Sequence, residues 1–280
     1  MSNIKISMVI LVKNEEDIIK ENILFHSKMG VDSFVVMDNN STDNTKNILQ
    51  ELQKEIKLTI IDETGPYQQS KFMTKIAKIA KKKYKPDWII NSDADEFWMP
   101  QKHSSLKEAL KNIKGSVLSI PRTNMALYKG LNNWKDNIYR VANPICRMEG
   151  FKNRYFLGKI GNKTIINPTG YIKTNSGNHS AEHLFFWQKK EFKDIVIFHF
   201  PVRSFEHFEA NIKNRYKLLK MGMKMGAQYK KWTKHYEKGV LKESYEDMFL
   251  EKSELDVLEK CFVIKKDDRL LNLFKKFNIY

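Results

Sequence analysis

The sequence predicts an α/β fold, with a mostly parallel central sheet flanked by helices and a helical C-terminal region. Three observations support this prediction. Short apolar runs rich in β-branched residues indicate strands that are buried on both faces. Segments with apolar residues at helical spacing separate these runs, and the connections are short, as in β-α units. Beyond residue 205, the apolar positions are typical of helices that pack on one another.

The first hundred residues contain the β-α units. Residues 4–12 form an apolar run, and residues 15–29 show helical spacing that ends at Gly30, which suits a helix C-terminal cap. The same alternation then repeats. We expect further strands at 31–37, 58–61 and 88–90, and helices at 43–55, capped by Ser41 or Thr42, and at 68–83.

The rest of the chain is less regular. A helix is expected at 104–112 and a strand at 116–120, and turn-rich sequence with mixed strands then continues to residue 178. A buried strand at 195–200 precedes a helix that begins at residue 205.

Charge and composition limit the possible partners. The chain of 280 residues has 49 Lys and Arg against 33 Asp and Glu, a net charge of +16 that favours polyanions. A Lys-rich, generally solvated surface is the alternative explanation. Two distant cysteines, Cys146 and Cys261, predict neither a disulfide framework nor a zinc site and fit a reducing cytosol. Because no apolar stretch approaches the roughly 20 residues of a membrane span, we expect a cytoplasmic protein, peripheral at most on the inner face of the cytoplasmic membrane.

An acidic motif, residues 91–98, directly follows the strand at 88–90. In an extended segment, Asp93 and Asp95 would point the same way, with Ala94 facing opposite. Two close carboxylates favour a cation between them, and Mn²⁺ or Mg²⁺ suits oxygen ligands while keeping positions open for phosphates. The alternative is a surface turn with scattered acids.

Polar clusters follow three of the predicted strands, at 13–15, 38–43 and 93–96. Ligands of parallel α/β sheets gather at the carboxyl ends of the strands. We therefore expect these clusters to share one edge of the sheet.

Residues 10–16, 36–45 and 91–97 together resemble the family 2 and related, family 92-like, glycosyltransferases of the GT-A (Rossmann-like) fold. Residues 199–208 resemble the segment that closes the site in the bacterial branch. The resemblance implies a glycosyltransferase domain at 1–205, with a nucleotide-binding half at 1–100 and an acceptor-side half at 101–205. A basic helical extension would occupy 206–280.

In proteins of this type, a nucleotide-sugar donor, most often a UDP-sugar, binds the first β-α unit, and the acidic motif holds its diphosphate through a divalent ion. The resemblance assigns roles by position to residues that fall in the matching motifs. Lys13, Asn14 and Glu15 would line the nucleotide pocket, Asp38 would contact base or ribose, Ser41 and Asp43 would support that loop, Asp93 would lie near the ribose and the ion, and Asp95 and His199 would bind the ion.

The resemblance also implies inversion at the anomeric carbon by a single displacement, which needs a general base. Glu182 is preferred to Glu206 for this role, at about the expected distance after the acidic motif. Other candidates are Lys163 and Arg203 at the leaving phosphate, His179 at donor phosphate or acceptor, and Trp98 as a sugar platform. The alternatives are a core histidine for His199, surface charge for Lys163, a turn residue for His179 and a core residue for Trp98.

The predicted function is metal-dependent transfer of a sugar to a glycan or glycolipid acceptor, such as capsule or lipopolysaccharide. A nucleotidyltransferase acting on sugar phosphates would also use a β-α nucleotide domain with paired Asp residues. Basic and aromatic residues interleave in segment 211–242, as on a surface for single-stranded nucleic acid. Because no other nucleic-acid signature occurs, we expect no nucleic acid as partner and assign this segment to an anionic membrane surface.

Overall fold

The computed structural model describes residues 4–145 and 155–279. Contacts within the chain define two compact units. The first contains residues 4–123, 160–199 and 272–279, and the second contains residues 124–145, 155–159 and 200–271. The predicted division of the chain at residue 205 stays a prediction.

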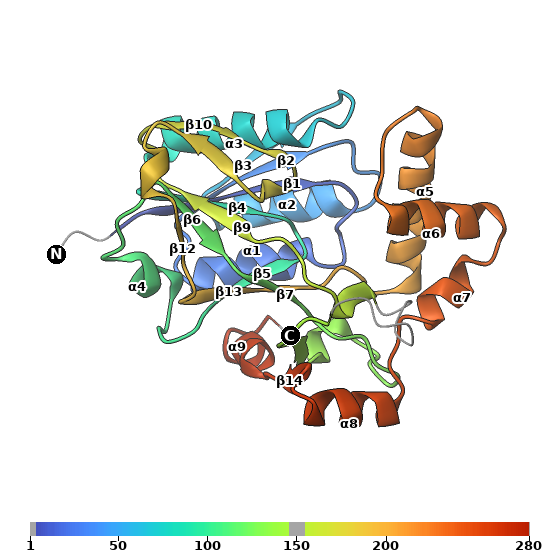
Figure 1. The fold of residues 1–280 in the computed structure, drawn as a ribbon. Helices are drawn as coiled ribbons and strands as arrows, with labels where there is room; N and C mark the ends of the chain where they lie inside the picture. The colour runs from blue at the N-terminus through green and yellow to red at the C-terminus, as the bar shows by residue number, and fades with distance from the viewer. Residues whose placement is uncertain (1–3, 146–154, 280) are drawn as a thin grey trace. The chain divides into compact units, whose positions relative to one another are not determined.

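A mostly parallel sheet forms the centre of the first unit, as predicted (Figure 1). Its strands lie in the order β12 (Lys190–Glu191), β6 (Val117–Ile120), β9 (Lys163–Ile166), β4 (Trp88–Ser92), β1 (Ile6–Val12), β2 (Ser33–Asp38) and β3 (Leu58–Asp62). β1 pairs in parallel with β2 and β4, and β2 pairs in parallel with β3. β9 runs antiparallel to both β4 and β6.

Helices cover the sheet because every second residue of its apolar strands faces the same side. One buried cluster joins Phe72, Met73 and Ile76 of α3 (Gln69–Tyr84) to Val9 and Val35 of the sheet. Figure 1 draws α3 on one side of the strands and α1 on the other. The remaining helices of this part are α1 (Ile19–Lys28), α2 (Thr45–Gln53) and α4 (Leu106–Leu110).

Smaller strand groups complete the first unit. β5 and β13 pair antiparallel, with His199 opposite Glu96, and β7 joins them on the other side of β13. β10 and β11 form an antiparallel pair. Their bounds are β5 (Glu96–Pro100), β7 (Arg122–Asn124), β10 (Tyr171–Thr174), β11 (Ala181–His183) and β13 (Ile195–His199), with 3-10 turns η4 (Ser176–Asn178) and η5 (Phe186–Gln188).

The second unit is mainly helical around its own core. Trp232 is 3% exposed, and its ring meets the rings of Phe208 at 5.1 Å and Tyr229 at 5.6 Å. Trp232 of segment 211–242 therefore belongs to this core, with the partly buried Tyr229 packed against it, and the lysines of the segment lie at the surface. Its helices are α5 (Phe205–Lys220), α6 (Ala227–Glu237), α7 (Leu241–Glu246), α8 (Lys252–Lys260) and α9 (Arg269–Lys276), the last of which continues into the first unit. The strands β8 (Tyr139–Val141) and β14 (Ile264–Lys266) form an antiparallel pair, and there are 3-10 turns at η1 (Trp134–Asp136) and η3 (Tyr155–Leu157).

The predicted elements exist, but some of their ends differ. α1 begins four residues later than expected, because residues 16–18 form a turn. The prediction that Ser41 or Thr42 caps α2 is wrong: Asn44 is at the N-cap, and the carboxylate of Asp43 accepts a hydrogen bond from the Thr45 amide (3.0 Å). Ser41 and Thr42 instead form hydrogen bonds with Asn14, in the loop after β1.

Two predictions on the chain's chemistry concern cysteines and membrane spans. Cys261 is free and exposed, and Cys146 lies outside the described residues. Among the residues that the structure describes, none of the helices has the length and apolar character required to cross a bilayer.

Candidate active site

The loops that follow β1 and β2 are held together by Asn14. This residue has a positive φ of 58°, a conformation that Asn tolerates better than most residues. Its backbone amide donates to the Ser41 hydroxyl (2.9 Å), and its side-chain oxygen accepts from the Thr42 amide (2.7 Å). Asn14 therefore fixes the geometry of the edge at which its own loop and the β2 loop meet.

Asp38 ends β2 and is 4% exposed. One of its carboxylate oxygens accepts hydrogen bonds from both the amide (3.1 Å) and the hydroxyl of Ser41. The next acid along the loop, Asp43, accepts from the Glu16 amide (3.2 Å). The structure thus brings Asp38, Ser41 and Asp43 together with Asn14 at one edge, as the strand-end argument predicts.

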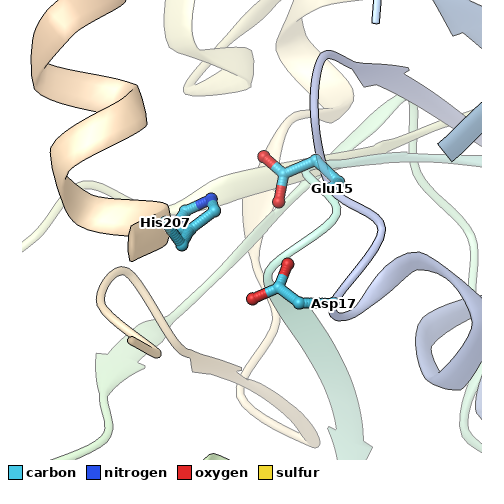
Figure 2. A group of neighbouring side chains, drawn as sticks. All are labelled: Glu15, Asp17 and His207. Carbon is cyan, nitrogen blue, oxygen red and sulfur yellow. The ribbon is translucent and has the colours of Figure 1, made fainter. Parts of the chain in front are cut away.

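Two further polar residues belong to the β1 loop. Lys13 is the first residue after β1 and is exposed. The amide of Glu15 donates to the hydroxyl of Thr45, the first residue of α2 (2.8 Å). Figure 2 shows Glu15 on this loop and Asp17 close to the start of α1. The edge therefore carries both a basic and several acidic side chains.

The acidic motif forms a turn between β4 and β5. Residues 93–95 lie outside both strands, so the expected extended backbone through Asp93 and Asp95 is wrong, and the two carboxylates have different partners. Asn22 of α1, fully buried, donates from its side-chain nitrogen to the carbonyl oxygens of Ala94 (2.8 Å) and Glu96 (2.9 Å). Helix α1 therefore holds the turn in place through an amide group.

His26, one helical turn after Asn22, supports the strand that leaves this turn. Its Nδ1 lies 2.8 Å from the Asn22 carbonyl oxygen, and its Nε2 accepts from the Trp98 amide (3.1 Å). Donation from Nδ1 and acceptance at Nε2 define one neutral tautomer. Burial lowers the pKa of His26 from 6.5 to about 3, although the bond to Asn22 opposes the shift.

This buried histidine predicts acid sensitivity of the fold. Below pH 6.5, His26 becomes protonated in the unfolded chain, whereas in the folded protein it stays neutral down to about pH 3. The free energy of unfolding should therefore be highest above pH 6.5 and should fall by up to about 1.4 kcal/mol per pH unit below it from this residue alone. Urea unfolding at a series of pH values measures the slope, which should be shallower for His26→Leu. The exposed-histidine variant His103→Gln should keep the wild-type slope, and equal slopes for His26→Leu and wild type would contradict the prediction.

Asp95 and His199 come together where β5 and β13 meet. The Asp95 Oδ2 lies 3.3 Å from the His199 Nε2, and both side chains retain some exposure, at 21% and 14%. With Glu96, they offer donor atoms that all lie within 4.8 Å of one another. A carboxylate oxygen and an imidazole nitrogen suit Mn²⁺, so the residues present fit a divalent ion. Asp93 is not part of this group.

Asp93 instead belongs to a charge cluster, which we define as Asp93, Glu96, Arg122 and Lys163; Glu96 and Lys163 are buried, and the Asp93 side chain is 31% exposed. The Lys163 ammonium pairs with Asp93 and lies 3.3 Å from the Glu96 carboxylate. Arg122 donates to Glu96 (2.8 Å), which is fully buried. Asn178 adds a hydrogen bond to Asp93 (3.0 Å). The two cations and two carboxylates of this cluster therefore have no net charge.

Lys163 is only 1% exposed, yet it keeps its charge. Burial by itself lowers the pKa of the ammonium, but the carboxylates of Asp93 and Glu96 outweigh burial and raise the pKa above its usual 10.5. The position expected for Lys163 at a leaving phosphate stays a prediction, since the structure shows its charge already matched by two carboxylates.

The candidates on β11 and η4 differ in their surroundings. Glu182 pairs with Lys173 (2.9 Å), and both side chains are about half exposed. His179 is exposed, and its Nδ1 lies 2.7 Å from the Asn162 carbonyl oxygen. Its ring occupies space that a Cβ on Gly177 would fill. Because Asn162 and His179 directly adjoin the two residues that bind Asp93, His179 is brought next to the charge cluster.

Arg203 and Trp98 are the remaining predicted residues. Arg203, in the second unit, donates to the Phe200 carbonyl (3.2 Å) and contacts the His207 Nε2 (2.7 Å). Figure 2 shows His207 at the start of a helix, which is the first turn of α5. The N-cap of this helix is Ser204. The hypothesis that Trp98 is a sugar platform is wrong, because its ring is fully buried and its indole nitrogen donates to the Ser92 hydroxyl (2.9 Å).

Sequence reasoning missed several residues that shape this site. Asn22, His26 and Asn178 act through hydrogen bonds to residues more than 70 positions away, and nothing in their local sequence marks them. Arg122 gave a weak signal, since it follows the predicted strand at 116–120 and is a basic residue at a strand end.

Comparisons with known proteins identify the family of this chain. A model of the family described as "Glycosyl transferase family 2" matches residues 7–170, more than half of the chain. No curated protein matches the sequence.

Solved structures resemble the chain at low identity. TarS (residues 1–349) from S. aureus in complex with UDP is 16% identical, with a TM-score of 0.47, over 74% of this chain and 63% of that one. The same protein in complex with UDP-GlcNAc is 13% identical, with a TM-score of 0.46, over 98% and 80%. A mycobacterial protein is 17% identical, with a TM-score of 0.38, over 80% and 76%. The match to the first of these structures spans less than two thirds of that protein's length.

Proposed function

We propose a reaction for this chain. The chain belongs to the glycosyl transferase family 2, and it is a glycosyltransferase with the predicted α/β fold of the GT-A type. It transfers a sugar from a nucleotide-diphosphate sugar, preferably a UDP-sugar, to a hydroxyl group of a glycan or glycolipid acceptor. One observation carries this proposal. Asp95 and His199 meet directly beside the strand that ends in the acidic turn, and the neighbouring strand ends are joined by hydrogen bonds.

The donor nucleotide binds the edge at which the loops after β1 and β2 meet. Asp38 contacts the base or ribose, and its carboxylate is already oriented by Ser41. Asn14 and Asp43 act through the loop shape that their hydrogen bonds fix. In the first unit, the full proposed set of donor-binding residues is Lys13, Asn14, Glu15, Asp38, Ser41, Asp43, Asp93, Lys163 and His179; the role of Arg203, in the second unit, stays a prediction.

A Mn²⁺ or Mg²⁺ ion fits the group formed by Asp95 and His199, with Asp93 as a proposed further contact. Such an ion supplies Lewis-acid stabilisation of the negative charge that develops on the departing diphosphate. The protein's own contribution is orientation. Asn22 fixes the turn that carries Asp95, and the pairing of β13 with β5 fixes His199 beside it.

The acceptor hydroxyl loses its proton to a general base as it attacks the anomeric carbon, and the configuration inverts in this single displacement. We propose Glu182 as the base. Its carboxylate is half exposed beside Lys173, so an acceptor that arrives from solvent can reach it. The relation to family 92-like enzymes rests on the resemblance of residues 10–16, 36–45 and 91–97 and is also a proposal.

We further propose that the acceptor is a surface glycan or its lipid-linked precursor, such as capsule or lipopolysaccharide, and that the protein works in the cytoplasm at the inner face of the membrane. The lysines of segment 211–242 support electrostatic attraction to an anionic membrane surface. The burial of Trp232 disfavours this segment as a platform on which nucleic-acid bases stack.

The products test the reaction. Purified protein is incubated with Mn²⁺ and a panel of UDP-sugars labelled in the nucleotide, with water as the default acceptor and with glycan extracts as added acceptors. A glycosyltransferase releases nucleoside diphosphate, and one donor should also raise the protein's melting temperature. Release of pyrophosphate from nucleoside triphosphate and sugar phosphate, in place of diphosphate, would overturn the proposal in favour of a nucleotidyltransferase.

A further inference from the structure

The turn after β11 presents a run of apolar side chains to solvent. Leu184, Phe186 and Trp187 are 62%, 65% and 65% exposed, and Phe185 is 37% exposed. Ile172, on the paired strand β10, is also exposed, at 42%. Four consecutive exposed apolar residues are unusual on a soluble surface, where single ones are common. We call Leu184–Trp187 the aromatic turn.

The aromatic turn is held in one conformation. The Leu184 amide donates to the Gly170 carbonyl (2.8 Å), and the Phe185 amide donates to the His183 Nδ1 (3.0 Å). Gly170 has a positive φ of 88°, and a Cβ at this position would lie only 3.1 Å from the Phe185 ring. The Trp187 ring meets the ring of Phe186 at 5.3 Å. The exposed rings are therefore presented by a structured support, which lowers the entropic cost of binding.

Two basic side chains follow the aromatic turn. Lys189 and Lys190 come after Gln188 and are exposed, and residues 184–190 contain no acidic side chain, whereas Glu182 precedes the turn by two residues and Glu191 follows Lys190. The whole chain carries +16. Trp and Phe favour the boundary between lipid headgroups and acyl chains, and Lys beside them attracts anionic headgroups. The aromatic turn thus combines the two chemical features of a membrane-interface anchor.

We propose that the aromatic turn inserts into the interface of an anionic lipid bilayer, with Lys189 and Lys190 at the headgroups. A second copy of this chain fits the surface less well. In a two-fold pairing the same patch faces itself, so the lysines of one copy would lie close to those of the other and repel. A bilayer offers negative charge and apolar depth together.

This anchor goes beyond the proposed function, which assigned membrane attraction to segment 211–242. The aromatic turn lies two residues after Glu182 on β11, so its insertion would hold the proposed base at the lipid surface, where a lipid-linked acceptor presents its hydroxyl group. That consequence rests on the proposed function, but insertion itself does not. Vesicle binding needs no sugar transfer, and either proposal can fail alone.

Co-sedimentation with vesicles tests the anchor. The full chain should bind vesicles of phosphatidylcholine with phosphatidylglycerol more strongly than vesicles of phosphatidylcholine alone, and added salt should weaken the binding. The double variant Phe186→Ser with Trp187→Ser should bind at least about tenfold more weakly, because it removes the largest inserting side chains. Brominated lipid should quench the tryptophan fluorescence of the wild type and quench that of the double variant less.

A matched control removes apolar surface elsewhere. Val257 and Phe262 are 56% and 74% exposed in the second unit, and their double Ser variant should bind vesicles as the wild type does. Wild-type binding by the Phe186/Trp187 variant, or no vesicle binding by the wild type, would overturn the proposal. The proposal would also be overturned if light scattering showed a wild-type dimer that dissociates in the Phe186/Trp187 variant, with no vesicle binding by either protein. If vesicle binding were lost only in the double variant Lys213→Gln with Lys217→Gln, segment 211–242 and not the aromatic turn would be the membrane contact, and the proposal would be wrong.

Discussion

Replacing Asp95 with Ala is expected to lower the rate of sugar transfer in the presence of Mn²⁺ roughly a thousandfold. The carboxylate of Asp95 lies 3.3 Å from the His199 imidazole, and its loss leaves one of the two adjoining groups that are proposed to hold the ion. Charge on the departing diphosphate then loses its stabilisation. The fold should survive, because the Asp95 side chain is part-exposed and the turn is held by backbone carbonyls bound to Asn22.

Rates of nucleoside diphosphate release and Mn²⁺ titration calorimetry with UDP measure the two consequences separately. Asp268→Ala, which removes an exposed acid outside the acidic turn, serves as the matched control and should change neither. His199→Ala should weaken Mn²⁺ binding as well, by roughly ten- to a hundredfold. Asp95→Ala with wild-type turnover and wild-type Mn²⁺ affinity would exclude Asp95 as a ligand.

The predictable part of this molecule is the part that local pattern encodes. Apolar runs marked β1, β2 and β4, because a strand buried on both faces needs apolar side chains in both directions. Polar clusters directly after these runs then marked the edge, since a parallel sheet collects its strand ends on one side. Asp38 and Ser41, joined to the β1 loop through Asn14, follow from this rule.

The unpredictable part depends on pairings between distant residues. Asn22 and His26 lie on the inner face of α1, where helical spacing predicts apolar contacts, and their bonds to the acidic turn depend on how β5 leaves the sheet. The separation of Asp93 from Asp95 has the same origin. Local sequence gives two similar acids, and only tertiary structure brings Lys163 to one and His199 to the other.

That separation underlies the second large effect. Replacing Lys163 with Met is expected to lower the free energy of unfolding by about 3 kcal/mol. The ammonium is 1% exposed and offsets Asp93 and Glu96, of which Glu96 is fully buried. Without it, Arg122 still pairs with the fully buried Glu96, but Glu96 loses its second cation and Asp93, whose side chain is 31% exposed, loses the ammonium that it pairs with. Urea or thermal unfolding measures the loss.

A charge-balanced double variant separates electrostatics from packing. The double variant Lys163→Met with Asp93→Asn keeps Arg122 paired with Glu96 and has no net charge in the cluster, so it should regain part of the stability lost in Lys163→Met. The difference between its free energy of unfolding and the sum of the two single effects measures the coupling between the two side chains. Lys54→Met removes an exposed lysine paired with Glu51, with side-chain exposures of 67% and 71%, and should leave the melting temperature unchanged. If the effects of Lys163→Met and Asp93→Asn simply add, the two side chains are not coupled, and the stability of this region does not depend on their ion pair.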